Sequence, residues 1–158
     1  MTKPDDESLL RRSFDVAKRA QAGGCHPFGA ILAGPDGEVL MEQGNGFLPD
    51  HDMTGHAERI LAGRASIKYG SKLLADCTLY SSAEPCAMCA GAIYWSGIGR
   101  VVYGMSEHEL KSITGNHAEN PTLDLPCRNV FAAGQRKVEV LGPLLVEESR
   151  ALHEGAWG

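Results

Sequence analysis

Short apolar runs alternate along the chain with longer segments whose apolar residues recur at helical spacing. Residues 5–21 are predicted to form an amphipathic helix, which the two glycines at 23 and 24 would end. The apolar side chains of this helix stand among charged neighbours at Leu9, Leu10, Phe14, Val16 and Ala17. Two short apolar runs follow at 28–32 and 39–41, and the sequence Gly-Pro-Asp-Gly between them is typical of a turn. This pattern predicts a β-hairpin.

The rest of the chain continues the alternation. We expect helices at 57–65, at 85–95 with Pro85 as the first residue, at 127–133, and for about three turns from Pro143. Strands are expected at 77–81, 101–103 and 138–141. Between 105 and 126 the pattern indicates one short helix and a long loop. Strands that alternate with helices predict a three-layer α/β/α sandwich around a five-stranded mixed sheet.

Length and composition indicate an ordinary globular protein. A chain of 158 residues fits a single domain that spans residues 1–158. Hydrophobic residues make up 43% and charged residues 22%, which disfavours a disordered, fibrous or disulfide-stapled chain. Apolar runs stay well short of the ~18 residues that a membrane span needs. The acidic start of the chain lacks the apolar core of a signal peptide, so a cytoplasmic location is expected.

Charge and cysteine content narrow the possible chemistry. The chain has 15 Lys and Arg against 20 Asp and Glu, a net charge of −5. Without a basic run, an acidic chain is a poor candidate for nucleic-acid binding, so no nucleic-acid partner is expected. Five cysteines are an odd number. In a reducing compartment this number favours metal-binding or catalytic roles over disulfides.

Two cysteines are spaced as metal ligands. Cys86 and Cys89 lie three residues apart, so on a helix they would share one face. They follow Pro85 at a helix start, where free backbone N–H groups and the helix dipole stabilise thiolates. Such a pair suits Zn²⁺. By itself the pair is also compatible with two buried structural cysteines or with a redox pair.

A histidine and a glutamate complete the candidate metal site. His56 would be a third ligand, and no fourth stands at metal-like spacing, since Cys77 falls in a predicted strand and Cys25 and Cys127 are isolated. Because structural zinc sites use four protein ligands and catalytic ones keep a position for water, three ligands indicate catalysis. Glu58 could then exchange a proton with the activated water. The alternative is a solvated helix glutamate.

At these residues the sequence resembles the zinc-dependent cytidine deaminase superfamily, over roughly residues 5–157. The stretch Met-Cys-Ala-Gly-Ala-Ile-Tyr-Trp at 88–95 is most similar to bacterial guanine deaminases and nucleoside deaminases. The resemblance implies a cytidine deaminase-like fold, one zinc per chain, a homodimer, and hydrolytic release of ammonia from a nucleobase or nucleoside, with guanine favoured. A cytosine or other pyrimidine or aminoheterocycle deaminase is the alternative. A tRNA adenosine deaminase or a non-catalytic zinc module is less favoured.

The resemblance also suggests which residues bind the substrate. They are Phe28 as a stacking wall, Asn45 as a hydrogen-bonding side chain, the backbone at Ala57, and Trp95 and Trp157 near the pocket. Phe28 could instead be core packing and Asn45 a turn residue. Trp157 is expected to cover a pocket, its own or a partner subunit's, or to lie in an exposed tail. An acid that reads the base edge is expected among Glu107, Glu109, Asp124 and Glu154.

Overall fold

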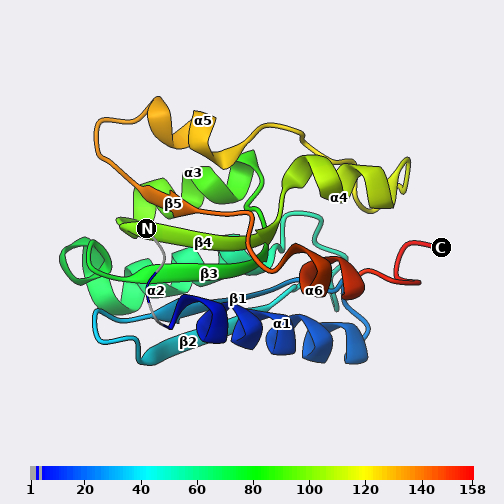
Figure 1. The fold of residues 1–158 in the computed structure, drawn as a ribbon, viewed down its shortest axis with the longest axis horizontal. Coiled ribbons are helices and arrows are strands. Elements are labelled where there is room, and N and C mark those ends of the chain that lie inside the picture. The colour runs from blue at the N-terminus through cyan, green and yellow to red at the C-terminus, as the bar shows by residue number, and fades with distance from the viewer. Residues whose placement is uncertain (1–2, 4) are drawn as a thin grey trace.

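The computed structural model describes residue 3 and residues 5–158 and shows one sheet with helices packed on both sides (Figure 1). Its elements in chain order are α1 (Asp6–Ala22), β1 (Gly29–Ala33), β2 (Val39–Gly44), α2 (Ala57–Leu74), β3 (Thr78–Ala83), α3 (Ala87–Ser96), β4 (Arg100–Met105), α4 (Glu107–Thr114), α5 (Cys127–Ala132), β5 (Glu139–Leu141) and α6 (Val146–Ala151).

The sheet has five strands in the order β2-β1-β3-β4-β5. β1 pairs antiparallel with β2 and with β3, whereas β3, β4 and β5 run parallel to one another. The structure thus confirms the mixed five-stranded sheet. Because the three parallel strands point the same way, their carboxyl ends meet at one edge, where α/β proteins commonly place their ligands.

Helices bury both faces of the sheet, and the strands are accordingly apolar on both sides. One face packs through Ala30 and Leu32 against α2, α3 and α5. The opposite face packs through Ile31 and Tyr80 against α1 and the segment after α6. Every residue of β1, β3 and β4 is buried. The prediction of three layers is therefore confirmed.

Several predicted boundaries are wrong, each for a local reason. The helix expected at 57–65 continues to Leu74, with a kink at Gly70, whose φ is 75°. The helix expected from Pro85 begins at Ala87, because the backbone of Cys86 is extended. The last helix begins at Val146 rather than at Pro143, since Leu145 has a left-handed backbone with φ of 51°. The segment after β4 holds the expected short helix, α4.

A buried ion pair fastens α1 to the start of β4. Asp6, which is 0% exposed, accepts hydrogen bonds from both terminal nitrogens of Arg100 at 2.8 Å. It also accepts the Tyr80 hydroxyl at 2.7 Å. This network lies at the edge of the sheet opposite the carboxyl ends of β3 and β4.

A second buried contact fastens α6 between β3 and β4. The Ser149 hydroxyl donates to the carbonyl of Ser82 at 2.5 Å and accepts the N–H of Met105 at 3.0 Å. A Cβ at Gly104 would come within 2.6 Å of the Ser149 oxygen, so only glycine leaves room for this contact. The segment that follows α6 is thereby placed near the carboxyl ends of the parallel strands.

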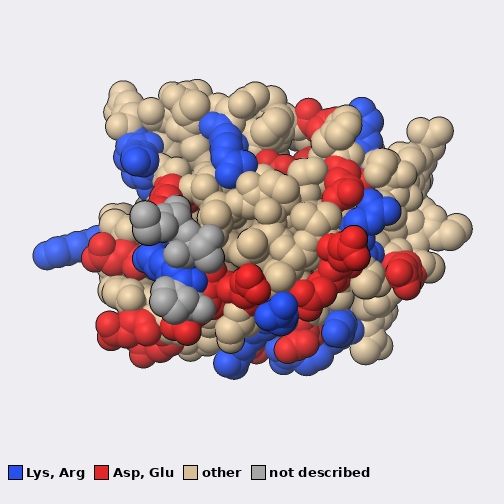
Figure 2. Space-filling model, viewed as in Figure 1, with Lys and Arg blue, Asp and Glu red and all other residues tan. Residues whose placement is uncertain are grey.

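On the face seen in Figure 2, Lys and Arg are interspersed with Asp and Glu. Exposed arginines of α1 pair with acids of neighbouring elements, as Arg12 does with Glu42 at 2.8 Å and Arg11 with Glu148 at 3.0 Å. Exposed pairs of this kind contribute little stability. Among the described helices, none combines the length and apolar character that a bilayer crossing requires.

Candidate active site

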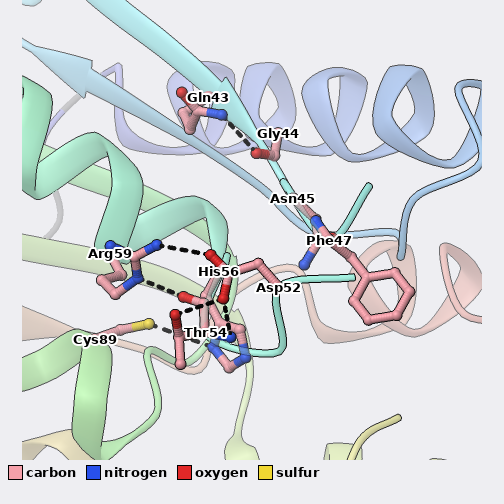
Figure 3. A network of polar contacts seen from close by, with 9 residues as sticks. All are labelled: Gln43, Gly44, Asn45, Phe47, Asp52, Thr54, His56, Arg59 and Cys89. Atoms are coloured by element: carbon pink, nitrogen blue, oxygen red, sulfur yellow. Dashed lines mark hydrogen bonds and ion pairs between the residues drawn. The ribbon is translucent and has the colours of Figure 1, made fainter. Parts of the chain in front are cut away.

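A loop ordered by hydrogen bonds and an ion pair positions His56 at the start of α2 (Figure 3). The Asp52 carboxylate accepts the backbone N–H of Thr54 at 2.9 Å and its hydroxyl at 2.7 Å. Arg59 donates to the carbonyl of Thr54 and forms an ion pair with Asp52 at 3.5 Å. At the other end of the loop, the Asn45 side chain accepts the N–H of Phe47 at 2.9 Å. His56 itself is the extended N-cap of α2.

The two cysteines meet this histidine from the neighbouring helix. Cys86 is the N-cap of α3 and Cys89 lies in its first turn. Each Sγ is 3.5 Å from Nδ1 of His56. In tetrahedral zinc coordination, Zn–S bonds of about 2.3 Å and Zn–N bonds of about 2.0–2.1 Å place sulfur and nitrogen about 3.5 Å apart. The three side chains therefore fit Zn²⁺, and they are the one such ligand group found within residues 3 and 5–158.

The thiols and a nearby carboxyl have altered proton affinities. Hydrogen bonding from Cys89, helped by His56, lowers the pKa of Cys86 to about 4 despite its burial. Hydrogen bonding to Cys86, together with burial, raises the pKa of Cys89. Glu58, in the first turn of α2, is 6% exposed, and its burial raises the pKa of its carboxyl to about 7. A carboxyl with such a pKa can both accept and release a proton at neutral pH.

A cavity of about 30 Å³ opens beside these groups. It is lined by Phe28, His56, Glu58, Glu84, Cys86, Glu107, Leu110 and Asn120. An adjoining cavity of about 10 Å³ shares Phe28, His56 and Asn120 with it and adds Asn45. A larger hollow of about 570 Å³ between α5 and β5 contains none of the candidate ligands, so the chemistry lies in the smaller space.

The structure brings some of the expected substrate residues to these cavities. Phe28 lines both, and Asn45 lines the second. Ala57 is fully buried between His56 and Glu58. Trp95 lies outside both cavities and is 84% exposed. Because it follows Cys89 by six residues of helix, its side chain points about 120° away from that of the metal ligand around the helix axis.

Trp157 packs behind the pocket wall of its own chain. Its ring lies 6.0 Å from Phe28 and 5.0 Å from His26, where it stacks. The indole N–H donates to Nδ1 of His153 at 3.0 Å. Burial lowers the pKa of His153 to about 4, so its ring is neutral at neutral pH, and acceptance from the indole assigns the remaining proton to Nε2. The tail is therefore an ordered backing for Phe28 rather than an exposed end.

Only one of the four acids proposed to read the base lines the cavity. Glu107 is 6% exposed, and burial raises the pKa of its carboxyl to about 9. Its carboxyl makes no hydrogen bond with the described part of the chain. The other three are occupied elsewhere or exposed. Glu109 pairs with Arg150 at 3.0 Å, Asp124 with His108 at 2.9 Å, and Glu154 is exposed.

The side chains of Glu84 and Asn120 line the cavity without having been predicted. Glu84 lies beside the Pro-Cys pair, and this position next to a candidate ligand is the one signal in the sequence that points to it. Asn120 lies in a loop where no periodic pattern exists, so nothing in the sequence identifies it.

The fold and the site together define a class. A carboxyl and a three-residue metal site meet in a buried cavity at the carboxyl edge of a parallel sheet, as in mononuclear zinc hydrolases. Residues 3–105 match the family described as the cytidine and deoxycytidylate deaminase zinc-binding region. The chain belongs to this family and is a zinc-dependent hydrolytic deaminase.

Several known proteins are similar to it. A probable cytosine deaminase of Schizosaccharomyces pombe is 40% identical over 152 residues, covering 96% of this chain and 92% of that protein. The guanine deaminase of Bacillus subtilis is 40% identical over 103 residues, covering 65% of each. The structure of NE0047 in complex with 2,6-diaminopurine has a TM-score of 0.80 at 26% identity, covering 99% of this chain and 83% of the other.

Proposed function

We propose that the chain deaminates a free nucleobase, rather than a nucleoside or a base within RNA. The observation that carries this proposal is the enclosed space beside Glu58, with a volume of about 30 Å³. A free base makes the smaller demand on this space, because an attached sugar would need additional room. Phe28, backed by Trp157, closes one wall of this space.

We infer that Glu107 reads the base as a neutral acid. A protonated carboxyl offers one donor and one acceptor side by side. It is complementary to a base edge on which an N–H stands next to an acceptor. Cytosine has such an edge at N1–H and the 2-carbonyl, and guanine has one at N1–H and the 6-carbonyl. The carboxyl of Glu107 makes no hydrogen bond with the described residues, so it is available for this pairing.

Two bases remain candidates, each favoured by its own observation. Guanine is favoured by the 88–95 stretch and by the likeness to NE0047, which was solved with 2,6-diaminopurine. Cytosine is favoured by the fungal relative, whose similarity extends through 96% of this chain. A pyrimidine, with a single ring, also needs less volume in the small cavity than a purine with two fused rings.

The mechanism assigns a role to each side chain. His56, Cys86 and Cys89 would hold Zn²⁺, which when bound supplies the Lewis acidity that brings the pKa of water toward 7. Glu58 takes one proton from the attacking water and gives it to the ring nitrogen, then takes the second proton of the same oxygen and gives it to the leaving amine. The C–O bond forms first and the C–N bond to the amine then breaks, so water is consumed and ammonia leaves. Phe28 holds the ring flat, and Asn45 orders the loop before His56.

A substrate panel tests this function. The purified protein is incubated with cytosine, guanine, their nucleosides and an aminotriazine, and ammonia release is measured with and without a chelator. We expect release from a free base that stops when the metal is removed. Release from nucleosides alone, or tight salt-sensitive binding of an anticodon stem-loop, would overturn the proposal.

We further propose that the chain forms a homodimer through α2 and α3. These helices pack side by side, and each exposes a large apolar residue, Ile67 at 90% and Trp95 at 84%. Burying such residues is the usual driving force of a symmetric interface. Light scattering is expected to give the mass of two chains, and Trp95→Glu to shift the protein to one chain. A monomeric wild type would contradict this.

A further inference from the structure

Glu84 connects three parts of the site through one side chain. It follows β3 directly, precedes Cys86 by two residues, and is 5% exposed. One of its carboxylate oxygens accepts the backbone N–H of Glu107 at 2.9 Å. The other accepts the backbone N–H of Cys127 at 2.8 Å. Its own N–H donates to the carbonyl of Met105 at 2.9 Å, which continues the pairing of β3 with β4.

The two amides that Glu84 binds are the first residues of two different helices. Glu107 opens α4 and Cys127 opens α5. The first N–H groups of a helix have no partner inside it, and the helix dipole favours a negative charge at that end. Pro126, the N-cap of α5, provides no side-chain cap, and Ser106 caps α4 only through Glu109. One carboxylate therefore satisfies the starts of both helices.

The hydrogen bonds of Glu84 control the position of Glu107 relative to the metal ligands. Glu84 is linked to Cys86 through Pro85 alone, and it binds the backbone of Glu107. Glu84, Cys86 and Glu107 all line the same cavity. Each oxygen of Glu84 accepts a backbone amide at the start of a helix, an arrangement by which a side chain sets geometry.

We propose that Glu84 is a positioning residue that holds the starts of α4 and α5 against the metal ligands, so that the carboxyl of Glu107 meets the bound base. The inference rests on the proposed function of Glu107. Holding both helices requires, at position 84, a side chain with two acceptor atoms and enough length to reach two backbone amides. Glutamine keeps the length but offers only one acceptor, and its NH₂ group would face one of the amide donors.

The test compares Glu84→Gln with the wild type in the full-length, zinc-loaded protein. We expect KM for the preferred base to rise about tenfold or more, because a hydrogen bond to a charged group is lost next to Glu107. The value of kcat should stay within about threefold, since Glu58 and the metal ligands are untouched. Zinc content should not change. NMR hydrogen exchange should show faster exchange of the Glu107 or Cys127 amide.

Asp6→Asn is the matched control, because it breaks a buried carboxylate contact at the opposite edge of the sheet. It should lower the unfolding free energy and speed exchange at these two amides no more than at other buried amides, while KM stays unchanged. An unchanged KM in Glu84→Gln, loss of zinc together with kcat, or two amides that remain protected would each overturn the proposal. If the wild type deaminates none of the bases, the proposed function fails, and amide exchange still decides whether Glu84 holds the two helices.

Discussion

The contact between Asp6 and Arg100 allows a quantitative prediction about stability and pH. Burial by itself would raise the pKa of Asp6, but hydrogen bonds from Arg100, from the backbone of Lys3 and from Tyr80 lower it to about 2, against 3.8 for an ordinary aspartate. Each pKa unit corresponds to about 1.36 kcal/mol. Ionised Asp6 therefore stabilises the fold by about 2.5 kcal/mol at neutral pH.

The sign of the pH dependence follows from the lowered pKa. The contribution is fully present above the unfolded pKa of 3.8 and is lost as pH falls through that value toward 2. By linkage it is about half as large at pH 3 as at pH 7. Asp6→Asn also leaves Arg100, which is 3% exposed, with Glu139 as its remaining carboxylate partner. Breaking a buried pair in this way costs about 3–5 kcal/mol.

Urea unfolding of the wild type and Asp6→Asn at several pH values measures this effect. We expect the variant to be less stable by about 2–5 kcal/mol at pH 7. The gap between the two proteins should narrow below about pH 4, as the wild type loses the contribution. Tyr80→Phe, which removes one donor and no charge, should cost about 1 kcal/mol at pH 7 and less at pH 3, because this hydrogen bond also helps lower the pKa of Asp6. A gap that is the same at pH 3 and pH 7 would refute the electrostatic reasoning.

Three further variants have definite expected outcomes. Glu58→Gln should keep zinc by metal analysis and lower kcat for ammonia release by about 10²–10⁴, because the proton carrier is lost. Ser149→Ala should lower the unfolding free energy in urea by about 1–3 kcal/mol, since the N–H of Met105 loses its buried acceptor. Trp157→Ala should raise KM by about two- to tenfold, because aromatic contacts of about 0.5–1.5 kcal/mol no longer back Phe28.

For each of these three variants, one result would contradict the expected role of the residue. Unchanged kcat in Glu58→Gln would show that another group moves the proton. Ser66→Ala, an exposed position on α2, is the control for Ser149→Ala, and equal stability of the two would contradict the role of the buried hydroxyl. Unchanged KM in Trp157→Ala would show that Phe28 keeps its place without the tail.

The sequence predicts most of the sheet and the metal ligands, because both depend on local rules. Apolar runs place the strands to within a few residues, and the spacing of Cys86 and Cys89 reflects the geometry of one helical turn. The helix ends are harder to predict, since they depend on single backbone angles. Leu145 has a positive φ, so α6 begins only after it, and no pattern of side chains predicts this backbone angle.

The substrate side of the pocket could be predicted only in part. Four acids were candidates to read the base, and the structure brings Glu107 alone to the cavity. That choice depends on where α4 begins, which Glu84 fixes through a contact between residues far apart in the chain. Trp95 was expected near the pocket from its motif, yet the pitch of α3 turns it to the surface. Long-range contacts and helix phase therefore limit such predictions.

The parallel course of β3, β4 and β5 also determines how the protein can be handled. A chain that leaves β5 emerges at the same edge as the cavity, and the start of α1 and the C-terminus lie apart in Figure 1. A fluorescent fusion or affinity tag joined after Gly158 would stand beside Trp157 and disturb its packing behind Phe28. The start of α1 lies far from this aromatic packing, so anchoring the enzyme to a sensor chip ahead of that helix is the choice that leaves the wall of the cavity undisturbed.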